Sequence, residues 1–230
     1  SAGFSLSWFR GYDPFYGFRI HHLQVFPVPE IIYQPDFYLK NTIGADFELP
    51  VNKWITRMEI AANIIDDYKT VMHTPNPDLY YVMGVEHDFA GIVTILQYIG
   101  RYTFDFSPLE SPSLSDPADP LARLQYAEEM IVYESALFNR KIFHQQEEKN
   151  HAFMISVNRS FAYEIIRTEL SVYYNITSGE YLIRPALTWN ISDNMTAYLG
   201  GSFMKGPENS VFSKAGDVLN GIFAGMKFNF

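Results

Sequence analysis

Residues 41–64 read NTIGADFELPVNKWITRMEIAANI, and this stretch decides the fold class. On both sides of the segment PVNK, apolar residues occupy alternate positions, as at Ile43 and Phe47 before it and at Met58 and Ile60 after it. Alternation with a period of two is typical of a β-strand with two unlike faces. Two such strands joined by a tight turn predict a β-hairpin.

The same stretch also predicts how the two strands pair. A four-residue loop at 50–53 would pair Leu49 with Trp54. Because residues that lie opposite each other in an antiparallel pair point to the same side, this register would place Asp46 opposite Arg57 on the polar face.

The alternating pattern recurs along the whole chain, which therefore reads as one all-β domain. We count about ten strands, a number at which a small antiparallel barrel can close. The predicted strands cover residues 3–9, 41–49, 54–64, 79–89, 91–106, 153–158, 166–175, 181–191, 195–203 and 219–230.

The connections between the strands differ in length in an ordered way. Short turns are expected near 50–53, 90–91, 159–162 and 192–194, and the short TSGE turn at 177–180 is an exception on the other rim. Long outer loops are expected near 11–36, 66–78, 107–138 and 205–218. Short turns at one rim and long loops at the other are typical of a transmembrane antiparallel up-and-down β-barrel. A soluble barrel, the alternative, gives no reason for this segregation.

The polar face of these strands carries charges in mid-strand, which would be costly in a dry core and is natural beside water. We therefore expect the polar face to line a lumen. The predicted pore-lining residues are Asp46, Glu48, Arg57, Glu59, Asn63, Gln97, Arg101, Arg167, Glu169, Arg184 and Lys227. Opposed charges on neighbouring strands would cancel much of the field, so no strong preference for cations or anions is expected.

Composition restricts the other classes of protein. No apolar run is long enough for a transmembrane helix, and the first residues, SAGFSLSWFR, lack the order of a signal peptide, so any export signal is expected to have been removed. The absence of Cys excludes disulfides and thiolate metal sites. A formal net charge of -9 argues against a nucleic-acid partner.

The chain ends in GIFAGMKFNF, an alternating strand with a terminal aromatic residue. This segment resembles the C-terminal signal of Gram-negative outer-membrane proteins. The resemblance implies that Met226, Phe228 and Phe230 are read by the barrel-assembly machinery and that the protein lies in the bacterial outer membrane.

Longer segments carry a second resemblance. TIGADFELPVNKWITRMEIAAN, YYVMGVEHDF, LQYIGRY and YLIRPALTWNISDNMTAYLGGSFMKGPENSVF are similar to the C-terminal part of porin-like barrels of environmental proteobacteria, related to the alginate-export and similar uncharacterised porin families. The resemblance covers residues 1–106 and 150–230. It implies a lipid-embedded porin-like channel for passive passage of small polar solutes, with no catalytic motif and no cofactor. A barrel sheath that holds a multihaem cytochrome in an electron-transfer conduit is the alternative.

Other candidate sites have simpler explanations. His21 and His22 have no carboxylate or Cys at ligand spacing, so we expect no metal site there. Asp66, Asp67 and His73 share a loop whose Asp, Asn, Pro and Thr content is typical of solvated turns, so no enzyme is expected.

The segment DPLARLQYAEEMI predicts a helix with Asp119 as the N-cap and Pro120 at its first position. This helix would rest on the outer rim, fold inward as a constriction or plug, or face a partner.

The resemblance matches only the C-terminal portion of longer barrels, so we expect the ten strands to leave open edges. Strand edges in a membrane must be paired, because unpaired backbone groups in hydrocarbon cost several kcal/mol each. The edge at residues 3–9 would then pair with strands from a further N-terminal segment, another chain or a second copy.

Overall fold

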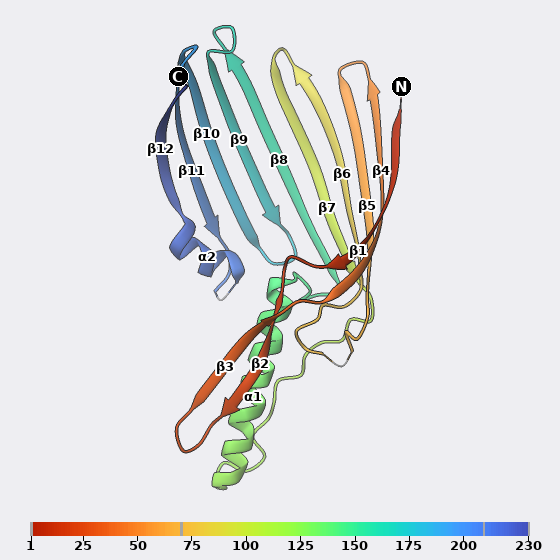
Figure 1. The fold of residues 1–230 in the computed structure, drawn as a ribbon, viewed down its shortest axis with the longest axis vertical. Coiled ribbons are helices and arrows are strands. Elements are labelled where there is room, and N and C mark those ends of the chain that lie inside the picture. Colours follow the sequence, from red (N-terminus) through yellow and green to blue (C-terminus); the bar gives the residue numbers. More distant parts are fainter. Residues whose placement is uncertain (1, 70, 209, 230) are drawn as a thin grey trace.

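The computed structural model describes residues 2–69, 71–208 and 210–229. Its main feature is a ten-stranded sheet in the order β1-β4-β5-β6-β7-β8-β9-β10-β11-β12, in which all neighbours are antiparallel (Figure 1). The strands are β1 Gly3–Tyr12, β4 Leu39–Val51, β5 Trp54–Ile65, β6 Asp78–Phe89, β7 Ile92–Thr103, β8 Lys149–Phe161, β9 Ile166–Asn175, β10 Glu180–Ser192, β11 Met195–Lys205 and β12 Gly221–Phe228. The all-β antiparallel fold predicted from the alternation is confirmed.

The predicted register of the first hairpin is wrong by two residues. Val51 pairs with Trp54, so Asp46 lies opposite Glu59, and Arg57 lies opposite Glu48. The strands continue to a two-residue turn because Asn52 adopts a positive φ of 57°, a conformation that Asn tolerates better than most residues. The predicted turn at 159–162 is displaced in a similar way, since β8 continues to Phe161 and the turn follows it.

A second, two-stranded sheet lies beyond the rim of long connections, in a segment that was predicted only as a loop. It consists of β2 Gly17–Gln24 and β3 Glu30–Asp36. The hairpin packs on a helix, because the Asn139 side chain bonds to both backbone groups of Phe18, at 2.7 and 2.9 Å.

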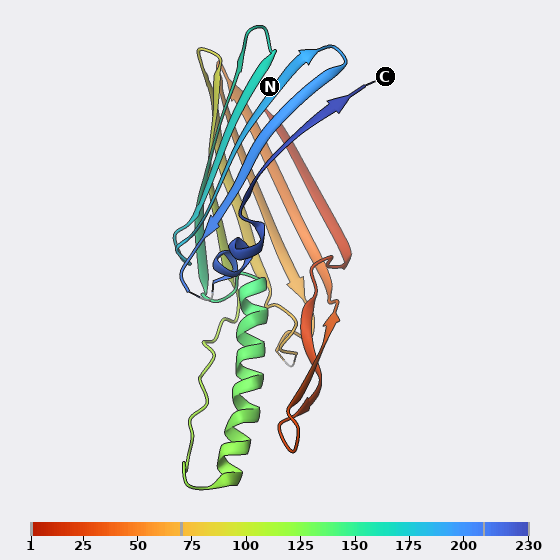
Figure 2. The ribbon, with the colours of Figure 1, turned by 90° about the vertical axis from the view of Figure 1, so that its left-hand side faces the viewer.

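The helix α1, Pro120–Ile142, is the one predicted from the segment after Asp119. Asp119 is its N-cap and accepts a hydrogen bond from the Leu121 amide at 2.9 Å. The helix is longer than the predicted segment and projects away from the sheet beside the β2–β3 hairpin (Figures 1 and 2). A second helix, α2 Val211–Leu219, lies in the predicted 205–218 loop and packs against β10 and β11.

The two rims of the sheet differ as predicted. The turns at 52–53, 90–91, 162–165 and 193–194 lie at one end of the sheet, while α1, α2 and the β2–β3 hairpin lie at the other (Figure 1). The short connection at 176–179 is again the exception at the end with the long connections.

The sheet is curved but open. Among the described residues, β1 pairs only with β4 and β12 only with β11, so no ladder closes the ten strands into a barrel. Figure 2 shows that the sheet curves so that these two edge strands lie on the same side, and we call its concave face the trough. The closed barrel is therefore not observed, whereas the expectation that these ten strands leave open edges is met.

A charged trough as the candidate functional site

The continuous register sorts the side chains of the large sheet onto two faces, because paired residues in antiparallel strands share a side. Every residue predicted to line a lumen falls on the same face. This face is the concave one, because it contacts α2. The Phe212 amide of α2 donates a hydrogen bond to Glu180, which lies on this face, and α2 lies inside the curve of the sheet (Figure 2). The predicted residues on this face are Asp46, Glu48, Arg57, Glu59, Asn63, Gln97, Arg101, Arg167, Glu169, Arg184 and Lys227.

The opposite, convex face is apolar and uncovered. Leu6 on β1, Leu96 on β7 and Ile222 on β12 have exposed fractions of 72%, 45% and 74%. In the described part of the chain, the buried apolar residues are Ile65, Phe143 and Ala152, so no second layer packs on this face. An apolar surface that extends across a whole sheet is far larger than the patches that soluble monomers expose.

The β4–β6 side of the trough is acidic. Arg57 joins three strands, with its Nε 2.9 Å from Glu48 and its Nη1 2.6 Å from Glu86. Asp46 and Glu59 lie directly opposite each other, and the Ser5 hydroxyl donates to Asp46. The predicted pairing of opposite charges across strands therefore occurs at Arg57, but carboxylates outnumber cations around it.

The β9–β12 side carries three cations, Arg167, Arg184 and Lys227, beside the carboxylates of Glu169 and Glu180. Arg167 lies 4.0 Å from Glu169, at the limit of an ion pair. Within the described ranges, Arg184 and Lys227 have no ion-pair partner. The trough is thus divided into an acidic wall and a mixed wall on which Arg184 and Lys227 are unpaired among the described residues.

The base of the trough is closed in part by the chain that follows α1. Arg101 donates to the backbone carbonyl of Phe143, and its Nε lies 3.4 Å from Asp78. The Asp78 carboxylate also accepts hydrogen bonds from Asn63 at 2.7 Å and from Gln145 at 3.2 Å. Only the C-terminal end of α1 is held against the concave face by these contacts, so the helix does not enter the trough as a plug.

A second ion pair lies beside this cluster. Lys40 contacts Asp13 at 2.5 Å, and the Asp13 side chain is almost fully buried. Burial raises the pKa of the nearby Tyr38 hydroxyl, and the charge of Asp13 raises it further, so this phenol stays protonated and neutral. The loop that leaves β1 is thereby attached to the start of β4.

Glu180 holds α2 on the concave face. Its carboxylate is buried and accepts hydrogen bonds from the Phe212 amide at 2.8 Å and from the Ser178 hydroxyl at 2.7 Å. A carboxylate at a helix N-terminus is favoured by the free amides and by the helix dipole.

We expect Glu180→Ala to release α2 from the trough, because each lost hydrogen bond to this charged group contributes about 1.5–3 kcal/mol. Trypsin should then cleave at Lys205 and Lys214 faster than in the wild type. Glu180→Gln is the control, since its carbonyl oxygen can still accept from Phe212. Equal cleavage of the wild type and the Ala variant would contradict this role of Glu180.

The histidines and loop carboxylates do not form a centre. His21 and His22 lie on β2, and the His73 Nε2 lies 3.3 Å from Asp36 rather than beside Asp66 and Asp67. Desolvation by burial lowers the pKa of His73 and of His144. Within residues 2–69, 71–208 and 210–229, no three His, Asp or Glu side chains are placed to hold a metal ion.

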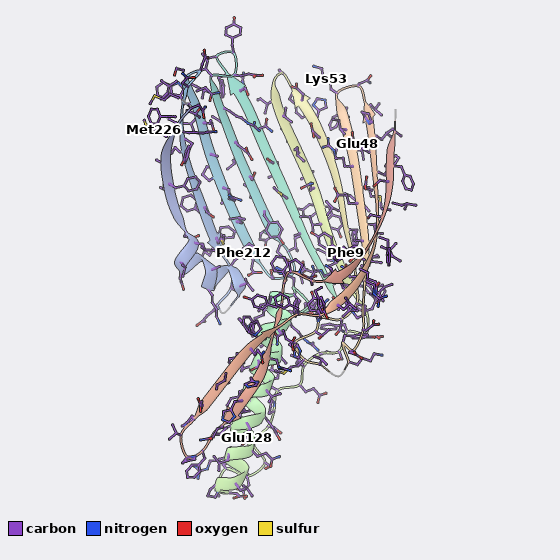
Figure 3. All side chains as sticks on the ribbon, viewed as in Figure 1. Phe9, Glu48, Lys53, Glu128, Phe212 and Met226 are labelled. Atoms are coloured by element: carbon purple, nitrogen blue, oxygen red, sulfur yellow. The ribbon has the colours of Figure 1, made fainter. Side chains whose placement is uncertain are left out.

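Two residues of the predicted assembly signal lie at the open edge. Met226 and Phe228 belong to β12, point to the convex face and are exposed, and Figure 3 labels Met226 there. Phe230 lies outside the described residues.

Sequence reasoning omitted several residues from the predicted lining. Glu86 is on the concave face by the same alternation that placed Arg57, so the strand pattern was sufficient to find it. Asp78, Lys40 and Glu180 begin or nearly begin their strands, and they become recognisable only through contacts with chain segments distant in sequence.

Neither helix in the described part of the chain is both long and apolar enough to cross a membrane. No known protein-family profile matches the chain, and no curated protein is detectably similar to it.

Proposed function

We propose that this chain forms the wall of a porin-like β-barrel in the bacterial outer membrane and that its concave face lines a passage for small polar solutes. One observation carries the proposal: the large sheet exposes an apolar convex face while its concave face carries charged residues from β4 to β12. Water would solvate the charged concave face but not the apolar convex face. In a barrel that spans a bilayer, the convex face would contact lipid and the concave face would contact the water in the lumen.

The strand lengths support the same proposal. The strands β4 to β11 contain 10 to 13 residues each. A tilted strand needs about 9–11 residues to cross the hydrocarbon core. Because an open edge is costly in lipid, the proposal includes further strands that pair with β1 and β12 and complete the barrel.

Planar-bilayer recording tests the passage. We expect the purified, folded protein to give stable ohmic steps with weak ion selectivity, since an acidic wall and a mixed wall face one lumen. Arg57→Gln should make the channel more selective for cations, because it leaves the carboxylates of Glu48 and Glu86 without their cation. The reversal potential in a salt gradient measures this change. Lys53→Gln is the matched control, since Lys53 lies at the rim in the β4–β5 turn (Figure 3).

The outcomes separate the candidate functions. A folded protein that shows no conductance and no partner would contradict the passage. Red haem-bearing chains that co-purify with the protein would favour the sheath around a multihaem cytochrome.

A further inference from the structure

A cavity of about 680 Å³ lies on the concave face where β8–β12 meet α2. This volume is within the range of small-molecule sites, about 300–1,000 Å³. The residues that matter for its chemistry are Ser171, Tyr173, Arg184, Ala186, Phe212 and Phe223. They come from strands of the mixed wall of the trough and from the helix that Glu180 holds there.

Small residues create the hollow, and aromatic rings form its walls. Ser171 and Ala186 lie on the concave face, and Ala186 is paired with Gly200. A Cβ on Gly200 would lie 2.4 Å from the Phe223 ring, so this ring rests directly on the backbone of β11. The rings of Tyr173 and Phe212 are 6.0 Å apart between centroids. The cavity therefore offers an apolar surface that can take a flat or branched hydrocarbon group.

Arg184 supplies the polar part of the cavity. It lies opposite Ser171, and in the described part of the chain its guanidinium has no ion-pair or hydrogen-bond partner. Glu169 also lines the cavity, but the side chain of Arg167 lies 4.0 Å from it. His144 is neutral near pH 7 because desolvation by burial lowers its pKa. Arg184 is thus the available charged donor, and a guanidinium binds a carboxylate with two parallel hydrogen bonds.

We propose that this cavity is a binding subsite for solutes that carry a carboxylate on an aromatic or branched aliphatic body. The carboxylate pairs with Arg184, and the body lies between Phe212 and Phe223. This inference rests on the proposed function, since it names the class of solute that the concave face receives.

The test measures binding to the purified full-length protein in detergent by calorimetry, with benzoate as the probe. Benzylamine keeps the ring and reverses the charge, and acetate keeps the carboxylate without the ring. We expect benzoate to bind more tightly than either. Arg184→Gln should weaken benzoate binding at least about tenfold, because it removes a charge-assisted bidentate pair. Ala186→Phe should abolish binding by filling the cavity while leaving Arg184 in place.

Lys227→Gln is the matched control, because it removes the same charge from the same face near the opposite end of β12. Three results would overturn the subsite: equal binding of benzoate and benzylamine, unchanged binding in Arg184→Gln or Ala186→Phe, and an equal loss in Lys227→Gln. The binding and conductance measurements test the two proposals independently. A conducting protein that does not bind benzoate refutes only the subsite, and a binding protein without conductance refutes only the passage.

Discussion

In the lipid environment that we propose for the convex face, replacing Leu96 by Arg is expected to destabilise the protein by about 2–4 kcal/mol, the cost of a cation near the bilayer midplane on the lipid side of a barrel. Leu96 lies in the middle of the central strand β7 on the convex face, and nothing covers it. In a protein surrounded by water the same substitution would place an exposed charge in solvent, where such changes usually stay within about 0.5 kcal/mol.

Its neighbour Gln97 provides the matched control. Gln97 lies on the concave face and is paired with Gly84, so an Arg at this position can extend into the trough. Reversible denaturant unfolding in lipid vesicles should show a large loss of stability for Leu96→Arg and a small change for Gln97→Arg. Equal stabilities for the two variants would contradict a lipid environment for the convex face.

The strands and the sorting of their side chains were predictable because both depend on neighbouring residues. Successive side chains in a strand point to opposite faces whatever the strand pairs with. Arg167, Arg184 and Lys227 therefore appear on the same side as Arg57, although they belong to distant strands. Within one strand the face assignment requires no knowledge of register, and polarity then indicates which faces of the different strands belong together.

The register, the extra elements and the ion pairs depend on more than local pattern. The two-residue turn after Val51 is set by the backbone conformation of Asn52, which the pattern of apolar residues does not encode. The β2–β3 hairpin packs on α1 through Asn139, more than a hundred residues away. Whether the sheet closes into a barrel depends on which strands pair with its two edges, β1 and β12. The sequence of a single strand does not predict this pairing.

The residues at the base of the trough illustrate the same limit. Arg101 was predicted as pore-lining, but its partners are Asp78 and the carbonyl of Phe143. Phe143 follows a 23-residue helix, so its return to β7 is a property of the folded chain rather than of the local sequence. A residue assigned to a lumen by alternation can therefore have a mainly structural role.

Arg101→Met is accordingly expected to destabilise the protein by about 3 kcal/mol, near the lower end of the 3–5 kcal/mol lost when a buried ion pair is broken on one side. The side chains of Arg101 and Asp78 are 22% and 8% exposed, so the remaining carboxylate would be left in a mostly buried site. Its hydrogen bonds from Asn63 and Gln145 reduce the loss but supply no positive charge.

Two further variants separate this buried-charge effect from a general effect of losing an arginine. Arg101→Met with Asp78→Asn should regain most of the stability, since it removes the unpaired charge and keeps an oxygen to accept from Asn63. Arg167→Met should cost less than about 1 kcal/mol, because its 4.0 Å contact with Glu169 is exposed to solvent. Denaturant unfolding gives the stabilities, and faster tryptic cleavage after Arg140 and Lys141 would report release of the helix end. A double variant that is no more stable than Arg101→Met would show that the unpaired charge of Asp78 does not cause the loss of stability. The loss would then come from the missing hydrogen bond between Arg101 and the carbonyl of Phe143.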